Sequence, residues 1–597
     1  MKHRYLLLSI ILLSTAASVL AQNISGYVRC KGIGVEGVVV SDGDSVTVTN
    51  ESGYYALQSQ KRNGYVFYSL PRGYEPTLTD GFQPQFWQKL LYANVKSNET
   101  HNFTLNKADN DNYTLILGAD SHLANRTRDL KQFKEGYIEC LKAEKQQAGK
   151  GKIYSMILGD LTWDNYWYSR NYNLNDFMNT CKEYGYPMTL WPVIGNHDND
   201  GATPAGDDCD FLSSAPWRNI VCPNYYSFNL GRVHYVVLDD VYYLNEDTGG
   251  NYAKGIVGSR NYSARFTPEQ LDWLRRDLAL VEDKEAPLIV ALHVPVWKLE
   301  TASPFTATAN LADDNSKTLC DMLKEFSNVH IVSGHTHYNY HAHPTGYKNI
   351  MEHNIAAICA SWWWTGYCTN RHVCRDGSPG GYSLWNVEGD RLQWKYKSIE
   401  QNGDLQMRIY DMNTVKDYFE TNDSVKKMLE VYPSRTVYRD FAKNTVLINV
   451  FAYDTDWRIF VYEGSKRRTV TRIYGEDPYH TICYDVPRVF QNGSYTSTFT
   501  SCKVSHLFKV QANTADNPIT VRLTDSFGNQ YVQSIRRPHP FSLDMEQQQT
   551  SDDLSGIRSV ANRQQPQAAV AYDLQGRPAG HHSRGIVIQK GKKIHQH

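Results

Sequence analysis

The sequence lacks three features that would place the chain in a narrow class of proteins. Its formal net charge is only -1 over 597 residues, so it has no excess of positive charge for binding nucleic acid or an anionic membrane. None of its 11 cysteines forms a CxxC pair, which argues against a thiolate metal site. Beyond the first 21 residues, no apolar run is long enough to cross a bilayer. We therefore expect no nucleic-acid polymer as partner and no transmembrane segment.

The first 21 residues have the pattern of a secretory signal peptide. Lys2 and Arg4 supply positive charge, residues 5–13 form a short apolar run, and the stretch from Val19 to Ala21 is typical of a cleavage site. We expect the mature chain to begin at Gln22. We also expect it to be exported and to be periplasmic, displayed on the cell surface or secreted.

The odd number of cysteines, 11, leaves at least one thiol outside any intramolecular disulfide. Cys209 and Cys222 flank one segment that reads as a loop, and Cys368 and Cys374 flank another. In an exported protein, this spacing predicts a disulfide within each pair. The connectivity of the whole set stays open, because sequence alone does not determine it.

Changes in residue pattern divide the remaining chain into five parts. Residues 22–108 combine short strand patterns with turn signals, which predicts a β-sandwich. Residues 109–350 alternate apolar strands with helical patterns, which indicates a layered α/β domain. Residues 351–540 return to short strands and predict a mainly β domain. Residues 541–565 are rich in Gln, Ser and Asp and predict a linker. Residues 566–597 resemble the C-terminal sorting modules of proteins exported by gliding-type secretion systems.

Polar residues follow five predicted strands of the α/β domain at the point where each strand ends. These strands are 113–117, 154–158, 190–194, 288–292 and 329–332. Because the carboxyl ends of strands in an α/β sheet line the active site, we expect these polar side chains to meet at one edge. They are Asp120, His122, Asp160, Asn196, His197, Asp198, His293, His335 and His337.

Carboxylate, amide and imidazole groups form the ligand set of manganese, iron and zinc. The set is too large for a single ion, so it predicts two divalent or trivalent metal ions that share one carboxylate. The glycines before several of these residues are expected to allow sharp turns of the backbone.

Together these motifs resemble the signature of the calcineurin-like metallophosphoesterase superfamily. The resemblance implies a four-layer αββα core and hydrolysis of a phosphate ester by in-line attack of a metal-bridging hydroxide. It further implies one metal held by Asp120, His122 and His337, and a second held by Asn196, His293 and His335. Asp160 would bridge the two ions.

The resemblance also implies roles for the residues around His197. This histidine would protonate the leaving group, and Asp198 would orient its imidazole ring. Asp164 stands one place later than the second Asp of the common pattern, so its role stays open.

The flanking segments resemble those of one exported subfamily. Residues 22–108 are similar to its prealbumin-like N-terminal sandwich. The runs 361–364 and 376–382 are similar to its C-terminal β domain. Three consecutive tryptophans, Trp362, Trp363 and Trp364, follow the last metal motif closely and would either line the site or pack between domains.

Two functions from different classes follow from these observations. The first is a secreted phosphoesterase that acts on a phosphorylated small molecule or glycan, as a monoester or a diester. The second is a non-catalytic surface protein that binds glycans or phosphorylated ligands through a retained metal site. A metal-dependent hydrolase of other bonds is a third possibility. The sequence leaves the substrate, the metal and the oligomeric state open.

Overall fold

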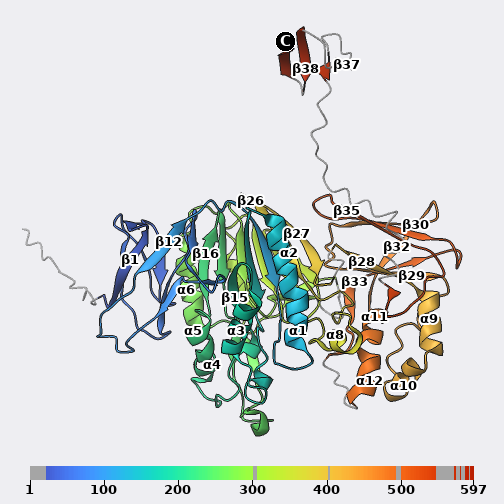
Figure 1. Cartoon of the computed structure of the whole chain (residues 1–597), viewed down its shortest axis with the longest axis horizontal. Coiled ribbons are helices and arrows are strands. Elements are labelled where there is room, and N and C mark those ends of the chain that lie inside the picture. Colours follow the sequence, from blue (N-terminus) through green and yellow to red (C-terminus); the bar gives the residue numbers. More distant parts are fainter. Residues whose placement is uncertain are drawn as a thin grey trace, which may run out of the picture.

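The computed structural model describes residues 22–299, 305–400, 404–492 and 499–545, and the backbone of four short strands between 571 and 596. The predicted signal peptide, residues 546–565 of the predicted linker and residues 566–570 of the predicted C-terminal segment lie outside the described residues. Figure 1 shows an N-terminal β region, a central α/β core and a C-terminal region of strands and helices in chain order. No helix in the described part of the chain is both long and apolar enough to span a membrane.

The N-terminal region contains two β-sheets, as expected for a sandwich. One has the order β11-β1-β12-β7, with β2 and β5 also on β1, and the other has the order β10-β6-β3-β4. Their strands are β1 (Ile24–Cys30), β2 (Ile33–Gly34), β3 (Val39–Ser41), β4 (Val46–Val48), β5 (Tyr54–Leu57), β6 (Tyr65–Tyr68), β7 (Tyr74–Pro76), β10 (Trp87–Lys89), β11 (Glu99–Thr100) and β12 (Phe103–Lys107). A hairpin of β8 (Leu78–Thr79) and β9 (Gln83–Pro84) extends from them.

The core is built on two sheets. The first has the order β15-β14-β13-β26-β27 and the second the order β16-β17-β20-β23-β25-β24. The strands of the first are β13 (Asn112–Gly118), β14 (Lys152–Leu158), β15 (Thr189–Val193), β26 (Gly381–Glu388) and β27 (Arg391–Ser398). Those of the second are β16 (Tyr226–Leu230), β17 (Val233–Val237), β20 (Leu288–Ala291), β23 (Val329–Ser333), β24 (Tyr340–Ala342) and β25 (Ile350–Asn354).

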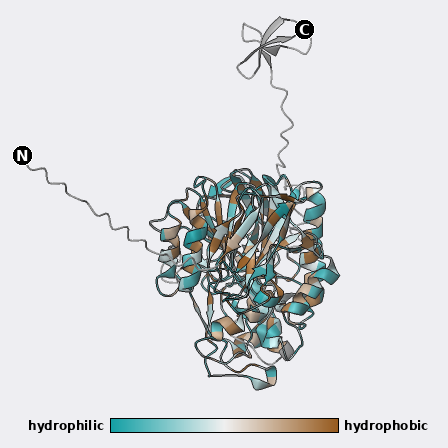
Figure 2. Ribbon diagram, turned by 90° about the vertical axis from the view of Figure 1, so that its left-hand side faces the viewer, coloured by the Kyte–Doolittle hydropathy of each residue, from teal (hydrophilic) through white to brown (hydrophobic). Residues whose placement is uncertain are grey.

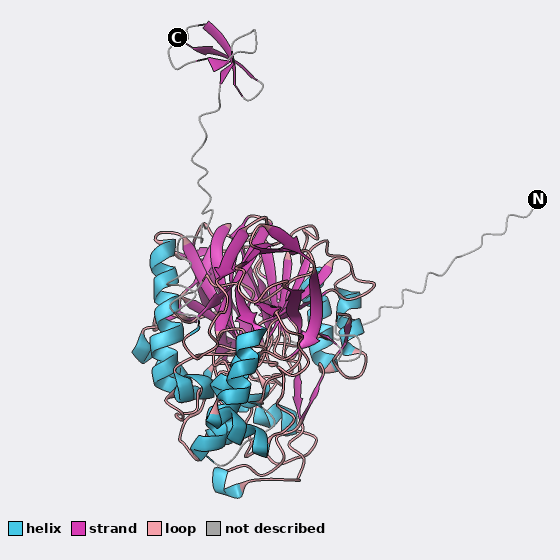
Figure 3. Ribbon diagram, turned by 90° about the vertical axis from the view of Figure 1, so that its right-hand side faces the viewer, coloured by secondary structure: helices cyan, strands magenta, loops and turns pink. Residues whose placement is uncertain are grey.

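The two core sheets pack face to face, with helices outside them. The Tyr113 hydroxyl on β13 lies 2.5 Å from the Tyr235 hydroxyl on β17, which joins the sheets across the interior. Figure 3 shows helices on both sides of the strands, and Figure 2 shows strongly hydrophobic residues along the central strands. Strands buried on both faces read as continuous apolar runs, and this explains why β14 and β20 could be predicted from the sequence.

The core helices and short strand pairs connect these sheets. The helices are α1 (Asp129–Phe133), η1 (Lys134–Ile138), α2 (Glu139–Ala148), η2 (Asp164–Tyr166), α3 (Leu174–Tyr184), η3 (Asn196–Asp198), α4 (Cys209–Ser213), α5 (Ala215–Ile220), η4 (Tyr252–Lys254), α6 (Pro268–Ala279), α7 (Asn315–Met322) and α8 (Trp364–Thr369). The strand pairs are β18 (Val241–Tyr243) with β19 (Tyr262–Ala264), and β21 (Trp297–Leu299) with β22 (Ala307–Ala309).

The C-terminal region forms two more sheets with helices beside them. The sheet orders are β28-β29-β33-β32 and β31-β30-β34-β35. The strands are β28 (Met407–Asp411), β29 (Thr445–Val450), β30 (Arg458–Glu463), β31 (Lys466–Arg468), β32 (Val470–Gly475), β33 (Val504–Gln511), β34 (Ile519–Thr524) and β35 (Gln530–Ile535). The helices are α9 (Met412–Thr421), α10 (Asp423–Val431), α11 (Pro478–His480), η5 (Thr481–Asp485) and α12 (Val486–Asn492). A separate small sheet contains β36 (Ala571–Tyr572), β37 (Pro578–Ala579), β38 (Gly585–Gln589) and β39 (Lys592–Gln596).

One expectation needs correction here, and one sheet extends across a predicted boundary. The strands β26 and β27 lie beyond the predicted division at residue 350, yet they complete the first core sheet next to β13. Neither predicted disulfide is present, since Cys209, Cys222 and Cys374 are all free thiols. The Cys222 thiol instead lies 3.2 Å from the Pro223 carbonyl oxygen, inside the hydrophobic core.

Candidate metal centre

The predicted ligands all lie on loops that follow core strands, at one edge of the two sheets. The loop after each strand supplies one or two of them. They are Asp120 and His122 after β13, Asp160 after β14, Asn196 after β15, His293 after β20, and His335 and His337 after β23.

One group of ligands surrounds His122. The Nε2 atoms of His122 and His337 lie 3.0 Å apart. Asp120 Oδ1 lies 3.3 Å from His337 Nε2 and 3.6 Å from His122 Nε2. This oxygen is buried and has no hydrogen-bond partner among the described residues. Three donor atoms therefore converge on one point.

A second group surrounds His293. Its Nε2 lies 3.0 Å from Asn196 Oδ1 and 3.2 Å from His335 Nδ1. Asp160 connects the two groups, because its Oδ2 lies 3.4 Å from His122 Nε2 and 3.2 Å from His293 Nε2. One carboxylate oxygen is thus shared between two sets of ligands.

Hydrogen bonds at the far edge of two rings orient these ligands. His293 Nδ1 lies 2.8 Å from the Leu158 carbonyl oxygen, and His337 Nδ1 lies 3.1 Å from that of Ala360. Because a carbonyl oxygen only accepts, both Nδ1 atoms donate, which leaves each neutral ring with a lone pair on Nε2 facing the centre.

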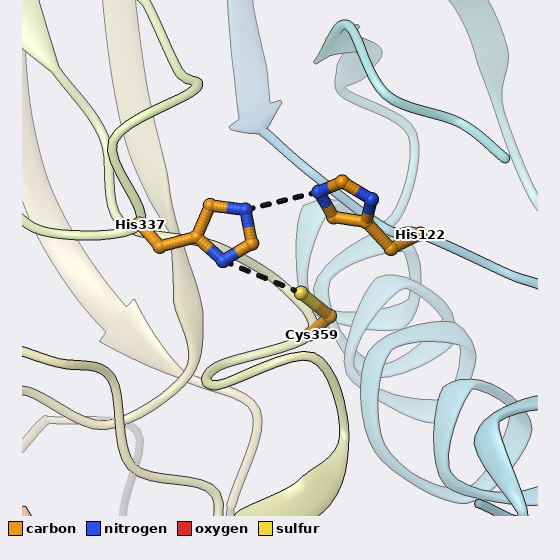
Figure 4. Close-up of side chains that lie close together, drawn as sticks. All are labelled: His122, His337 and Cys359. Carbon is orange, nitrogen blue, oxygen red and sulfur yellow. Dashed lines mark hydrogen bonds between the residues drawn. The ribbon is translucent and has the colours of Figure 1, made fainter. Parts of the chain in front are cut away.

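Cys359 was missed by the sequence analysis and lies beside this group. Its Sγ is 3.7 Å from His337 Nδ1, and Figure 4 shows it at the opposite edge of the ring from His122. Burial raises the pKa of this thiol well above its usual value. Cys359 therefore contacts the edge of His337 that faces away from His122, and one potential ligand atom from each of these three residues lies within 4.8 Å of the others.

The donor set fits metal cations on two grounds. Imidazole and carboxylate donors are the ligands of zinc, manganese and iron. The orphaned Asp120 Oδ1 is a buried acceptor that needs a cation or a proton.

Backbone strain is concentrated at the ligands. Asp120, His122, Asp160, His335 and His337 have φ angles of 55°, 42°, 53°, 68° and 60°. Left-handed backbone is uncommon outside glycine and costs of order 1–3 kcal/mol per residue, so the surrounding packing must impose it.

The glycines beside the ligands serve mainly to provide space. A Cβ on Gly195 would overlap the backbone N and the carboxylate of Asp160, although its own φ is an ordinary -117°. A Cβ on Gly159 would overlap the His293 ring, and only this glycine also needs a positive φ, 83°. Of these two glycines, only Gly159 has the expected role of allowing a sharp turn of the backbone.

The predicted partner of His197 is wrong. His197 Nδ1 lies 2.7 Å from Asp164 Oδ1, and Arg260 Nη1 donates to the same oxygen at 2.8 Å. Asp198 instead accepts from the backbone N–H groups of Leu161, Thr162 and Gly195. Asp198 therefore holds two ligand loops together, and Asp164 orients the imidazole.

The electrostatics of His197 suit a proton donor. Burial lowers its pKa, but the charges of Asp160 and Asp164 outweigh this and raise the pKa above its usual value. Its side chain is 23% exposed, which places it at the mouth of the centre. Burial, followed by the charge of Asp160, raises the pKa of Asp198 to about 7.

The tryptophans at 362 and 363 differ in role: one lies at the site, and the other packs in the interior. The Trp362 ring stacks on His337 with centroids 3.9 Å apart. Trp363 is fully buried and donates from Nε1 to the Ser121 carbonyl oxygen at 2.8 Å. Phe499 from the C-terminal region lies over Trp362 at 3.9 Å. Trp362 therefore flanks the metal centre, and Trp363 belongs to the core.

Two further residues near the centre carried no signal in the sequence. The Tyr262 hydroxyl on β19 lies 3.1 Å from His335 Nε2, and Arg260 pairs with Asp164 as described above. Both lie in the segment between β18 and α6, which contains none of the recognised motifs.

Comparison with protein families gives three matches along the chain. The profile of the calcineurin-like phosphoesterase matches residues 113–339. Profiles described as the N terminal and C terminal of calcineurin-like phosphoesterase match residues 22–108 and 352–531. Together the profiles cover all three regions of the fold.

Individual relatives are more distant. The chain is 27% identical over 185 residues to purple acid phosphatase 15 of Arabidopsis thaliana, a match that spans 28% of this chain and only 30% of that protein. A solved dimetal phosphatase from Danio rerio is 14% identical with a TM-score of 0.32, over 49% of this chain and 97% of the other. A 5'-nucleotidase from Candida albicans is 10% identical with a TM-score of 0.28, over 49% and 52%.

Proposed function

The chain belongs to the calcineurin-like phosphoesterase family, and from this premise we propose that it hydrolyses a phosphomonoester or phosphodiester with the help of two metal ions. The observation that carries the proposal is the position of Asp160, whose Oδ2 lies within 3.4 Å of a ligand nitrogen from each group. A shared carboxylate is what a pair of ions about 3.5–4 Å apart requires.

The residues have distinct tasks in this proposal. Asp120, His122 and His337 hold one ion, while Asn196, His293 and His335 hold the other. Manganese, iron and zinc all suit these donors. The chemistry that such a pair supplies is activation of a water and stabilisation of charge on the phosphoryl oxygens.

His197 is proposed to donate a proton to the leaving oxygen. Asp164 holds its ring in place, Arg260 holds the Asp164 carboxylate, and the partial exposure of His197 lets a substrate reach it. Asp198 contributes by fixing the loops that carry Asp160 and Asn196.

We propose that the substrate is a phosphorylated small molecule or glycan, because the family hydrolyses phosphate esters. We also propose that the protein is exported, which the signal-like pattern of residues 1–21 supports. The competing proposal is a non-catalytic surface protein that binds such ligands through the same metal centre.

Asp160→Asn tests this function directly. We expect the variant to lose metal and to lower kcat/KM for an aryl phosphate by about a thousandfold or more, since it removes the shared charged ligand. Metal content by elemental analysis and the hydrolysis rate are the measurements. Removing metal with a chelator should abolish activity, and adding manganese, iron or zinc back should restore it.

Asp272→Asn on the exposed face of α6 is the matched control, because within the described part of the chain its carboxylate forms an ion pair with Arg275 alone. It should keep both metal and activity. Full activity in Asp160→Asn with metal bound would rule out the mechanism. A metal-loaded wild type that binds phosphorylated glycans and cleaves neither monoesters nor diesters would support the non-catalytic alternative.

A further inference from the structure

A large cavity with cationic walls lies beside the metal centre. Its volume is about 910 Å³, and it lies against α1 and α8, which Figure 1 shows close together. Gln132 Nε2 joins these segments by donating to the Trp363 carbonyl oxygen at 3.3 Å. The cationic side chains that line the cavity are Arg126, Arg128, Lys131, Lys134 and Arg170.

The acidic residues of the cavity do not cancel this charge. Asp129 and Glu135 are its acidic lining residues. The Asp129 carboxylate accepts from three backbone N–H groups of the loop 124–130, at 2.7–2.9 Å. Glu135 lies 3.7 Å from Lys131 Nζ in an exposed pair. The remaining cations therefore face the cavity with no carboxylate of its wall paired to them.

Arg126 links the cavity to the metal centre. Its guanidinium lies 4.2 Å over the Trp163 ring, and its Nη2 donates to the Trp362 carbonyl oxygen at 3.3 Å. The same Trp163 ring lies 5.5 Å from the His122 ring and 5.8 Å from the His197 ring. A single indole therefore separates the guanidinium from two residues of the centre.

Aromatic rings contact this guanidinium, and its Nη2 bond to the Trp362 carbonyl oxygen leaves its other N–H groups for a ligand. Tyr166 and Trp364 lie 5.2 and 5.6 Å from it. Arg126 Nε is buried and has no hydrogen-bond partner among the described residues. Stacking leaves the in-plane N–H groups of an arginine available, and these groups match the geometry of phosphate and carboxylate oxygens.

We propose that this cavity is a second anion-binding subsite. It takes the second anionic group of a substrate whose phosphoryl group is at the metal centre. The substrate class is therefore a phosphorylated compound with another phosphate or a carboxylate. This inference rests on the proposed function and narrows its substrate.

Sugar phosphates with one or two anionic groups test the subsite. We compare kcat/KM of the metal-loaded full chain for glucose 1,6-bisphosphate, 6-phosphogluconate and glucose 6-phosphate. The wild type should prefer at least one of the first two by about tenfold or more, because a charge-assisted hydrogen bond is added. Comparing glucose 1,6-bisphosphate with 6-phosphogluconate shows whether the subsite prefers a phosphate or a carboxylate as the second anionic group. A wild type without any preference would overturn the proposal.

Arg126→Gln should reduce that preference ratio about tenfold, and Arg170→Gln should reduce it in the same direction. Arg170→Gln is the second variant because Arg170 is exposed and its loss is tolerable to the fold. Lys150→Gln, exposed and outside the cavity lining, is the matched control and should keep the wild-type ratio. An unchanged ratio in both arginine variants would overturn the proposal.

A binding measurement separates failure of the subsite from failure of the proposed function. Calorimetry of inorganic phosphate with the chelator-treated full chain needs no catalysis. Arg126→Gln should weaken this binding about tenfold relative to wild type and Lys150→Gln. If no phosphate ester is hydrolysed and this difference persists, the function fails and the subsite stands. If hydrolysis occurs and phosphate binding is equal in all three proteins, the subsite fails.

Discussion

At the scale of single residues, the centre shows how one position in a loop changes the role of a carboxylate. Asp198 is next to His197 in sequence, yet its oxygens are turned to backbone N–H groups of two loops. Asp164 is 33 positions away from His197 and touches its ring. Closeness in sequence therefore predicted the wrong carboxylate as the partner of His197. The reason is that the η3 turn directs consecutive side chains to different sides.

Exchanging each carboxylate for an amide should separate these roles. Asp164→Asn should lower kcat for an alkyl phosphate at least tenfold more than for 4-nitrophenyl phosphate, because only the poor leaving group needs a proton from His197. The rates for both substrates are the measurement.

Asp198→Asn is the matched comparison. Its new amide NH₂ would face backbone donors, so the free energy of unfolding should fall by roughly 1–3 kcal/mol, with both substrates affected alike. Equal losses on the two substrates in Asp164→Asn would contradict the role given to Asp164.

At the scale of elements, a buried carboxylate fixes a short strand of the N-terminal sandwich. Glu99 on β11 pairs with Lys61 and accepts from the backbone N–H groups of Leu91 and Tyr92 at 2.6 and 3.1 Å. Although burial raises its pKa, these partners lower it to about 2. A two-residue strand has few ladder hydrogen bonds of its own, so these side-chain contacts matter more than its sheet register.

This pKa shift predicts a dependence of stability on pH. A folded-state pKa below the ordinary value means that Glu99 stabilises the fold above about pH 4.5 and loses this effect as pH falls toward 2. Glu99→Gln should therefore be less stable than wild type near pH 6, by roughly 2 kcal/mol. The difference should shrink on acidification.

Urea unfolding followed across this pH range is the measurement. Glu51→Gln, in an exposed turn of the same sandwich, is the control and should show no such trend. A stability difference between wild type and Glu99→Gln that stays constant with pH would contradict the prediction.

At the scale of the whole molecule, regions distant in sequence meet at the candidate metal centre. Phe499 of the C-terminal region lies over Trp362, which stacks on the predicted ligand His337. Phe499 also lies 6.0 Å from Trp163, the indole between Arg126 and the centre. The C-terminal region therefore contributes an aromatic ring to the surroundings of this centre.

Phe499→Ala should weaken this aromatic contact. We expect kcat/KM for an aryl phosphate to fall about three- to tenfold, because the loss of a stacked aromatic partner, worth about 0.5–1.5 kcal/mol, loosens Trp362 behind His337. Steady-state kinetics and metal affinity are the measurements. Phe490→Ala, 47% exposed in the same region, is the control and should behave as wild type. Equal kinetics in both variants would show that the C-terminal region does not support the centre.

The sequence by itself determined the family, the α/β core and the loops that carry the metal ligands. Each of these depends on local pattern, namely apolar strands followed by short polar motifs.

Only the tertiary structure decided which residues meet across long stretches of chain. Packing of the sheets placed Asp164 and Arg260 at His197, moved β26 and β27 into the core sheet, and left Cys222 as a thiol in the hydrophobic core. It also divided the tryptophan run between the core and the metal centre. Such contacts depend on how elements pack in three dimensions, and no local spacing in the chain specifies them.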